Sequence, residues 1–292
     1  HYGADHVRHH AVFVKGSDFA HGVHVRCQPA FSDYQASCAL RRRPRIAARG
    51  RYRIRVRPDG GPCTGGRRRH SRVHEAEALR YIGYSGQQTD EVLDERIDSL
   101  IAACERDSAP AFVYKIFPVD ASGGVIRLQG SSLVLEGSAI YEHLHAARSC
   151  AVMAVTLGLA NERVAMRMKA RSALDAVVFG AAGSSLVECA ADACEAAIVA
   201  EAARLGLHTN WRFSPGYGDL PLDIQPAIVR TLEADKKLGM TVTDSNLLVP
   251  VKSVTAFVGL FDELYEGAKR SCAGCPCAAH CSLRKAGTPC YR

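Results

Sequence analysis

The apolar positions after residue 90 follow two different periods, and each period predicts one kind of element. After Asp90, which can cap a helix, apolar residues recur about every 3.6 residues at Val92, Leu93, Ile97, Leu100, Ile101 and Cys104. Three short stretches follow that are rich in branched and aromatic residues and are separated by Gly and Ser: AFVYKIFPV, GVIRLQG and SSLVLEG. This composition is typical of antiparallel strands.

The rest of this region continues as a mixture of helices and strands. The pattern predicts helices at 139–148, 161–171, 172–205 and 222–234, and strands at CAVMAVTLG, MTVTDS and SVTAFVGL. The helix at 172–205 is rich in Ala and could bend at its two glycines, Gly180 and Gly183. Because helices and strands come in runs and do not alternate strictly, we expect an α+β fold with an antiparallel or mixed sheet flanked by helices.

The first 74 residues have a different composition. They hold 16 Lys or Arg, four Asp and no Glu, a net charge of +12, whereas residues 75–292 carry −5. With a single Leu, this leader lacks the apolar stripe of a packed element, so we expect residues 1–74 to be disordered. A transit peptide, a nucleic-acid-binding arm and a misplaced upstream start codon stay open as explanations. Because the positive charge is confined to the leader, nucleic-acid binding by the chain as a whole is disfavoured.

Targeting signals and the use of cysteine indicate the cellular compartment of the protein. We find no apolar run of the roughly 18 residues that span a bilayer and no signal-peptide pattern. Of the 12 Cys, five crowd into the last 21 residues and most of the others follow apolar patterns, which argues against a secreted disulfide scaffold. We therefore expect a cytoplasmic protein with no membrane partner.

The cysteine-rich tail, residues 266–292, is one candidate for chemistry. Its five thiols are close enough in sequence for four of them to surround one ion or cluster at little cost in loop entropy: Cys272, Cys275, Cys277, Cys281 and Cys290. An iron–sulfur cluster and zinc both take four Cys, and free or disulfide-prone thiols are the third alternative.

The loop RFSPGYGDLPLDIQP, which begins at Arg212, is a second candidate. Arg can grip a carboxylate through two parallel hydrogen bonds. Pro215 stiffens the approach, and Gly216 has no side chain, so that a ligand can lie against the main chain. The spacing suits a ligand with a carboxylate and a planar group. The alternative is purely structural, with Arg212 paired to Asp219 or Asp223 in a tight connection to the next helix.

This loop, together with LRYIGYSG, YKIFPV, AVTLG and TVTDSNLLVP, resembles the activation domain of cobalamin (vitamin B12)-dependent methionine synthase in a stand-alone form. The similarity covers about residues 75–262, so we expect one activation-like domain at 75–265. Its most specific element is the Arg-x-x-x-Gly-Tyr signature, matched by Arg212, Gly216 and Tyr217. In the family this signature binds S-adenosylmethionine, and the resemblance implies the same ligand and fold here.

The resemblance also implies roles for single residues. Arg212 would hold the methionine carboxylate, and the Pro-Gly-Tyr run after it would present main chain and ring to the nucleoside. Glu188 occupies the helix position where the family carries an acid near the ligand's cationic groups. The segment TVTDSNLLVP resembles the family's Thr-Glu-Ser segment, with Asp244 in place of Glu and Ser245 matched. Asn246 stands where the long enzymes have an aromatic residue that helps to cover the ligand.

In that family, a corrinoid in the inactive Co(II) state is reduced and then methylated by S-adenosylmethionine. Such a transfer needs positioning more than proton transfer, so no catalytic acid or base is expected. The chain has no Asp-x-His-x-x-Gly motif, so the corrinoid would arrive on a partner, either the cobalamin-dependent methionine synthase core or another corrinoid protein. The electron would come from a donor such as flavodoxin or ferredoxin. The alternative function is a non-catalytic iron–sulfur or zinc module that acts as a redox or docking partner of corrinoid proteins.

Overall fold

The structure is a computed structural model that describes residues 11–14, 78–79, 81–82, 84 and 88–263. One antiparallel sheet, with the order β4-β3-β2-β5-β9-β6 and with β1 paired to β2, forms its centre. The strands of this sheet are β1 (Ala11–Val14), β2 (Ala111–Asp120), β3 (Ile126–Leu128), β4 (Val134–Leu135), β5 (Ser149–Thr156), β6 (His208–Thr209) and β9 (Ser253–Phe261). The strands β7 (Thr241–Val242) and β8 (Leu248–Val249) form a separate hairpin.

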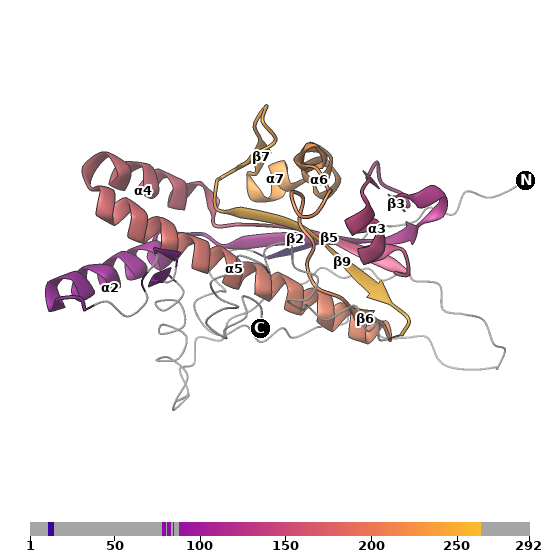
Figure 1. Ribbon diagram of the computed structural model, residues 1–292, viewed down its shortest axis with the longest axis horizontal. Helices are drawn as coiled ribbons and strands as arrows, with labels where there is room; N and C mark the ends of the chain where they lie inside the picture. The colour runs from indigo at the N-terminus through magenta and orange to yellow at the C-terminus, as the bar shows by residue number, and fades with distance from the viewer. Residues whose placement is uncertain (1–10, 15–77, 80, 83, 85–87, 264–292) are drawn as a thin grey trace, which may run out of the picture.

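Helices cover both faces of the sheet, which confirms the predicted α+β class. The helices are α2 (Glu91–Arg106), α3 (Ser138–Leu144), α4 (Gly158–Arg171), α5 (Ala173–Arg204), α6 (Gln225–Leu232) and α7 (Ala234–Leu238), with short 3-10 helices η2 (Ser122–Gly124) and η3 (Leu222–Ile224). Figure 1 shows α5 along one side of the sheet and α3, α6 and α7 on the other.

The central strand β5 is buried on both faces and lies between β2 and β9. Side chains alternate between the two faces of a strand. Met153 and Val155 therefore pack in the cluster that contains the sheet-facing residues of α5, while Val152 and Ala154 pack in the cluster with α3, α6 and α7. The continuous apolar run CAVMAVTLG follows from this two-sided burial.

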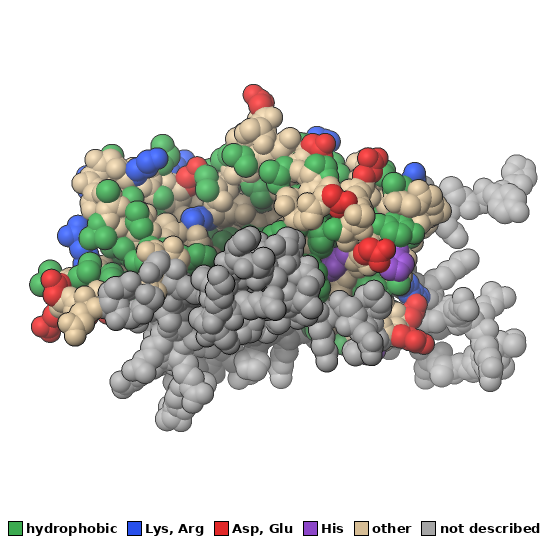
Figure 2. All heavy atoms as spheres, viewed as in Figure 1, with side chains coloured by type: hydrophobic (Ala, Val, Ile, Leu, Met, Phe, Trp, Pro, Cys, Tyr) green, Lys and Arg blue, Asp and Glu red, His purple; other side chains and the backbone are tan. Residues whose placement is uncertain are grey.

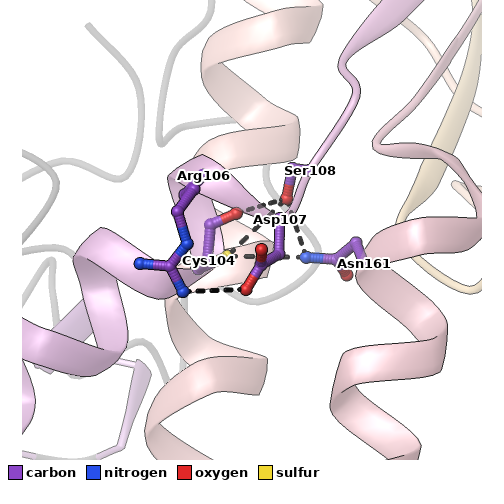
Figure 3. A network of polar contacts seen from close by, with 5 residues as sticks. All are labelled: Cys104, Arg106, Asp107, Ser108 and Asn161. Carbon is purple, nitrogen blue, oxygen red and sulfur yellow. Dashed lines mark hydrogen bonds and ion pairs between the residues drawn. The ribbon is translucent and has the colours of Figure 1, made fainter.

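A third apolar cluster joins α2, α4 and the first half of α5. Figure 2 shows hydrophobic side chains on the surface at this end of the molecule. Met166 of α4 and Val177 of α5 are exposed. A buried polar contact crosses the cluster (Figure 3): Asn161 Nδ2 donates to Ser108 Oγ at 2.9 Å and to Cys104 Sγ at 3.5 Å. Burial raises the pKa of the Cys104 thiol to about 11, so this cysteine stays protonated.

The structure confirms some of the predicted helix boundaries and changes others. Asp90 caps α2 through the N–H of Leu93 (2.8 Å), as expected from the sequence. The helix predicted at 222–234 is divided among η3, α6 and α7, because Glu233 takes a left-handed conformation (φ 56°) between α6 and α7. The helix predicted at 139–148 ends at Leu144, and α5 continues through its two glycines as one helix.

Two expectations about the chain as a whole need correction. Ala11–Val14 of the leader forms β1 and pairs with β2, so these four residues are not disordered; the remaining leader lies outside the described residues. Contrary to the expectation of no long apolar run, α5 is long and apolar enough to cross a membrane by length and composition. Its apolar residues cover the sheet, and α5 is therefore a core helix of this domain.

Two neighbouring residues of α5 offer a test of this packing. Ile198 is fully buried against the sheet, and Val199 is 44% exposed. Ile198→Ala should lower the free energy of unfolding by about 2–5 kcal/mol, because it removes buried methyl groups and leaves a cavity. Val199→Ala should change it by less than about 0.5 kcal/mol. Chemical denaturation of the two variants measures both values, and equal losses would show that α5 does not pack as described.

Candidate functional site

Arg212 lies in an edge segment, residues 208–213, that pairs with β9 in an irregular register. The segment stays in register up to Asn210, whose N–H donates to Gly259 O (3.2 Å). Pairing resumes where Phe213 and Phe257 exchange main-chain hydrogen bonds of 2.9 and 2.8 Å. Residues 211 and 212 therefore lie opposite one residue of β9, which is a β-bulge.

The bulge sends neighbouring side chains to opposite faces of the sheet. Trp211 and Phe213 pack on the α3 side, where their rings lie 4.6 and 5.0 Å from the ring of His143. His143 Nε2 lies 2.9 Å from the carbonyl oxygen of Trp211 and fixes this side of the segment. Arg212 points the other way, to α5.

The guanidinium of Arg212 contacts three carboxylates of α5. Nη2 lies 3.3 Å from Glu188 Oε2 and 2.8 Å from Asp192 Oδ1, and Nε lies 3.2 Å from Glu195 Oε2. The acids are spaced by four and three residues, so they share one face of the helix. We call these four residues the Arg212 cluster. The structure thus brings together two residues predicted from the sequence, Arg212 and Glu188.

The Arg212 cluster has an excess of negative charge and one unsatisfied donor. The Arg212 side chain is only 8% exposed, while those of Glu188 and Asp192 are 44% and 69% exposed. Nη1 of Arg212 is buried and has no hydrogen-bond partner among the described residues. A buried donor without a partner costs about 1–3 kcal/mol. The partly exposed carboxylates of the cluster can therefore accept a cation, and Nη1 is a buried donor that lacks an acceptor among the described residues.

The structural alternative for Arg212 named the wrong acids. Its partners are on α5, whereas Asp219 binds the start of α3 by accepting from Ser138 N (2.6 Å), Ser138 Oγ (2.8 Å) and Ala139 N (3.0 Å). Hydrogen bonds from Ala139 and Ser138 lower the pKa of Asp219 to about 2. Close approach at this anchor requires glycine, because a Cβ on Gly218 would lie 2.6 Å from Ala139 Cβ.

The Pro-Gly-Tyr part of the signature forms the exposed turn of the loop. Gly216 has φ +90°, a conformation that favours glycine, and its N–H donates to Leu220 O (2.8 Å). Tyr217 is 59% exposed, with its ring edge-on to Phe213 at 6.2 Å between centroids. Pro215 is buried beneath the turn. The geometry leaves the Tyr217 ring free to contact another molecule.

The outer edge of β9 is open beside the Arg212 cluster. Gly259 and Phe257 direct their main-chain groups outward to the segment of Arg212. In an antiparallel ladder this direction repeats every second residue, so Thr255 and Ser253 also direct N–H and C=O outward. Within the described part of the chain no segment pairs with these groups. We call this stretch the open β9 edge because its outward main-chain groups are unpaired among the described residues; Thr255 itself is only 2% exposed, and Ser253 is half-buried.

The structure does not bring Asp244 and Ser245 to this place. Both are exposed in the β7–β8 hairpin, whose Val242 and Leu248 pack against the core on the α6 side of the sheet. Figures 1 and 2 show the hairpin projecting away from α5. Asn246 has φ 63° in this turn, a left-handed conformation that Asn tolerates better than most residues.

The predicted metal ligands cannot be located. Cys272, Cys275, Cys277, Cys281 and Cys290 lie outside the described residues, and the metal site in the tail stays a prediction. Among the residues that the structure does describe, no group of three His, Cys, Asp or Glu could hold an ion. A small hollow between α2 and α5, lined by Ile101, Cys104, Glu105, Ala182 and Leu186, contains none of the predicted site residues.

Two acids of the Arg212 cluster were missed by the sequence analysis. Asp192 and Glu195 follow Glu188 in VECAADACEA at helical spacing, so the stripe of acids on an otherwise Ala-rich helix was visible. The sequence did not indicate which cation these acids contact, because Arg212 is 17 to 24 residues away in the chain. Arg212 is directed to α5 by a β-bulge that has no sequence signal.

The Asp219 anchor predicts a dependence of stability on pH. The folded pKa of about 2 lies below the ordinary value of 3.8, so the stabilisation is complete above about pH 5 and is lost as the pH falls through 4 towards 2. The difference in free energy of unfolding between wild type and Asp219→Asn should shrink over this window. Denaturation at several pH values measures it, with Asp223→Asn as an exposed control from the same loop. A difference independent of pH would contradict the anchor.

No protein-family model matches the chain, and no match was found among the curated proteins. Among solved structures the chain is similar to the crystal structure of the MetH reactivation domain bound to AdoHcy, with 17% sequence identity and a TM-score of 0.48. The alignment covers 73% of this chain and 83% of the other. A likeness at this level establishes neither a ligand nor an activity for this chain.

Proposed function

We propose that the chain binds S-adenosylmethionine at the Arg212 cluster and the open β9 edge, and that it supports methylation of a corrinoid carried by a partner protein. The observation that carries the proposal is Arg212 Nη1, a buried donor without a partner beside three carboxylates. The Arg-x-x-x-Gly-Tyr signature, matched at Arg212, Gly216 and Tyr217, supports the same ligand.

The charges of the ligand fit the residues present. A carboxylate oxygen at Arg212 Nη1 supplies the acceptor that this nitrogen lacks. The amine and the sulfonium are both cationic and suit the partly exposed Glu188 and Asp192. The nucleoside is planar and polar at its rim, so it can take the main-chain groups of the open β9 edge at Thr255 and Ser253.

The chain's part in the reaction is to hold and orient the methyl donor. When bound, S-adenosylmethionine supplies a methyl group that the reduced cobalt of the substrate corrinoid accepts, and S-adenosylhomocysteine remains. An electron donor of the flavodoxin or ferredoxin class supplies the electron that the inactive Co(II) state requires. No proton moves in the methyl transfer itself, so a site that consists of positioning residues without a catalytic base is sufficient.

A partner must present the corrinoid. The proposal assigns this part to the core of a cobalamin-dependent methionine synthase or to a related corrinoid protein in the cytoplasm. The proposal assigns ligand binding to the Arg212 cluster and the open β9 edge, and it gives the predicted iron–sulfur or zinc site in the tail no part in this binding.

Calorimetric titration of the full chain with S-adenosylmethionine tests the ligand. Wild type should give saturable heat, and Arg212→Ala should weaken binding roughly 10–100-fold, the size expected for a lost hydrogen bond between charged groups. Arg212→Lys keeps the charge but not the forked donor, so it should show an intermediate affinity.

Arg230→Ala is the matched control, since Arg230 is an exposed arginine of α6. Its affinity should equal that of wild type. Absence of saturable heat with wild type, or unchanged affinity of Arg212→Ala, would contradict the proposed function.

A further inference from the structure

Lys252 lies at the start of the open β9 edge, directly before Ser253, and has no part in the site described so far. Its Nζ donates to Ser184 Oγ of α5 (2.7 Å), and Ser184 Oγ donates to Gly180 O (3.1 Å). No carboxylate among the described residues forms an ion pair with Lys252. An ammonium group has three donors, so two N–H groups of Lys252 stay available.

The position of the Lys252 side chain is fixed by α5. A Cβ on Gly183 would lie 3.3 Å from Lys252 Cε and 3.4 Å from Cγ, so the glycine makes room for the lysine stem. Burial lowers the pKa of Lys252, with a smaller opposing contribution from the nearby Cys104. The amine is therefore held in place at a partly desolvated position.

Lys252 and Arg212 contact the same helix, α5, about two turns apart. Ser184, Glu188 and Asp192 are spaced by four residues and share one face of α5. With a rise of about 1.5 Å per residue, the eight residues from Ser184 to Asp192 span about 12 Å. Ser184 binds Lys252 and Asp192 binds Arg212, while Ser253 and Thr255 of the open β9 edge follow Lys252 in the chain.

We propose that Lys252 is a specificity-determining residue, which donates to the hydroxyl oxygens or ring nitrogens at the nucleoside end of the ligand held by Arg212. This inference rests on the proposed function. The Arg212 cluster binds the zwitterionic end of the ligand together with its sulfonium. Lys252 binds the neutral, acceptor-rich nucleoside end, at Ser184, about two turns of α5 before Asp192. The site then selects an amino acid joined to a nucleoside over the amino acid alone.

Three ligands separate the two ends of the site in titrations of the full chain. S-adenosylmethionine and S-adenosylhomocysteine carry the nucleoside, whereas S-methylmethionine keeps the carboxylate, amine and sulfonium without it. Lys252→Met retains the stem over Gly183 and removes the donors, so it should weaken the two nucleoside ligands about tenfold and leave S-methylmethionine unchanged. Lys236→Met is the control, because Lys236 is an exposed lysine of α7.

The outcomes distinguish this inference from the proposed function. Equal weakening of all three ligands by Lys252→Met would show that the lysine only supports the structure around Arg212, and an unchanged affinity for S-adenosylmethionine would remove it from the site. In both cases the proposed function stands if Arg212→Ala still weakens S-adenosylmethionine binding by roughly 10–100-fold. A wild type that binds none of the three ligands overturns both.

Discussion

The site depends on the burial of one guanidinium. Taking a charge out of water costs several kcal/mol unless partners compensate it, so Arg212, at 8% exposure, requires the carboxylates of α5. The ion pairs tie the edge of the sheet to its longest helix and hold the bulged segment against β9. They supply acceptors to two of the three guanidinium nitrogens, Nη2 and Nε, and leave Nη1 without a hydrogen-bond partner among the described residues. The same interaction is therefore structural and leaves one donor without a partner, which is the donor that the proposed ligand would use.

The remaining features of the site follow from this arrangement. Three acids around one base leave negative charge at the surface, which attracts a cation without any further residue. The edge segment leaves β9 at Phe213, and this departure leaves the outward main-chain groups of Thr255 and Ser253 without a pairing strand among the described residues. Asp219 binds the start of α3 and not Arg212, so the loop is held independently of the ligand. The proposed methyl transfer would require such fixed contacts, because it depends on positioning of the donor.

Much of the fold could be predicted because its long elements have one clear period. The cap at Asp90, the doubly buried β5 and the apolar helix α5 follow from local composition. The strands β6 and β8 have two residues each and are too short to show a period. The break at Glu233 depends on a left-handed backbone conformation, which a Glu in the sequence does not indicate. For the site, the signature located Arg212, and Glu188 was matched to it. The other two acids required the tertiary contact, and Asp244 and Ser245 lie on another side of the sheet.

The central claim is that Arg212 Nη1 receives the carboxylate of the ligand. Titration with S-adenosylmethionine and with its decarboxylated form, which keeps the amine, sulfonium and nucleoside, tests this contact directly. Wild type should bind S-adenosylmethionine at least about tenfold more tightly than the decarboxylated form, and the preference should vanish in Arg212→Ala. Equal affinities in wild type, or a preference that persists in Arg212→Ala, would contradict the account.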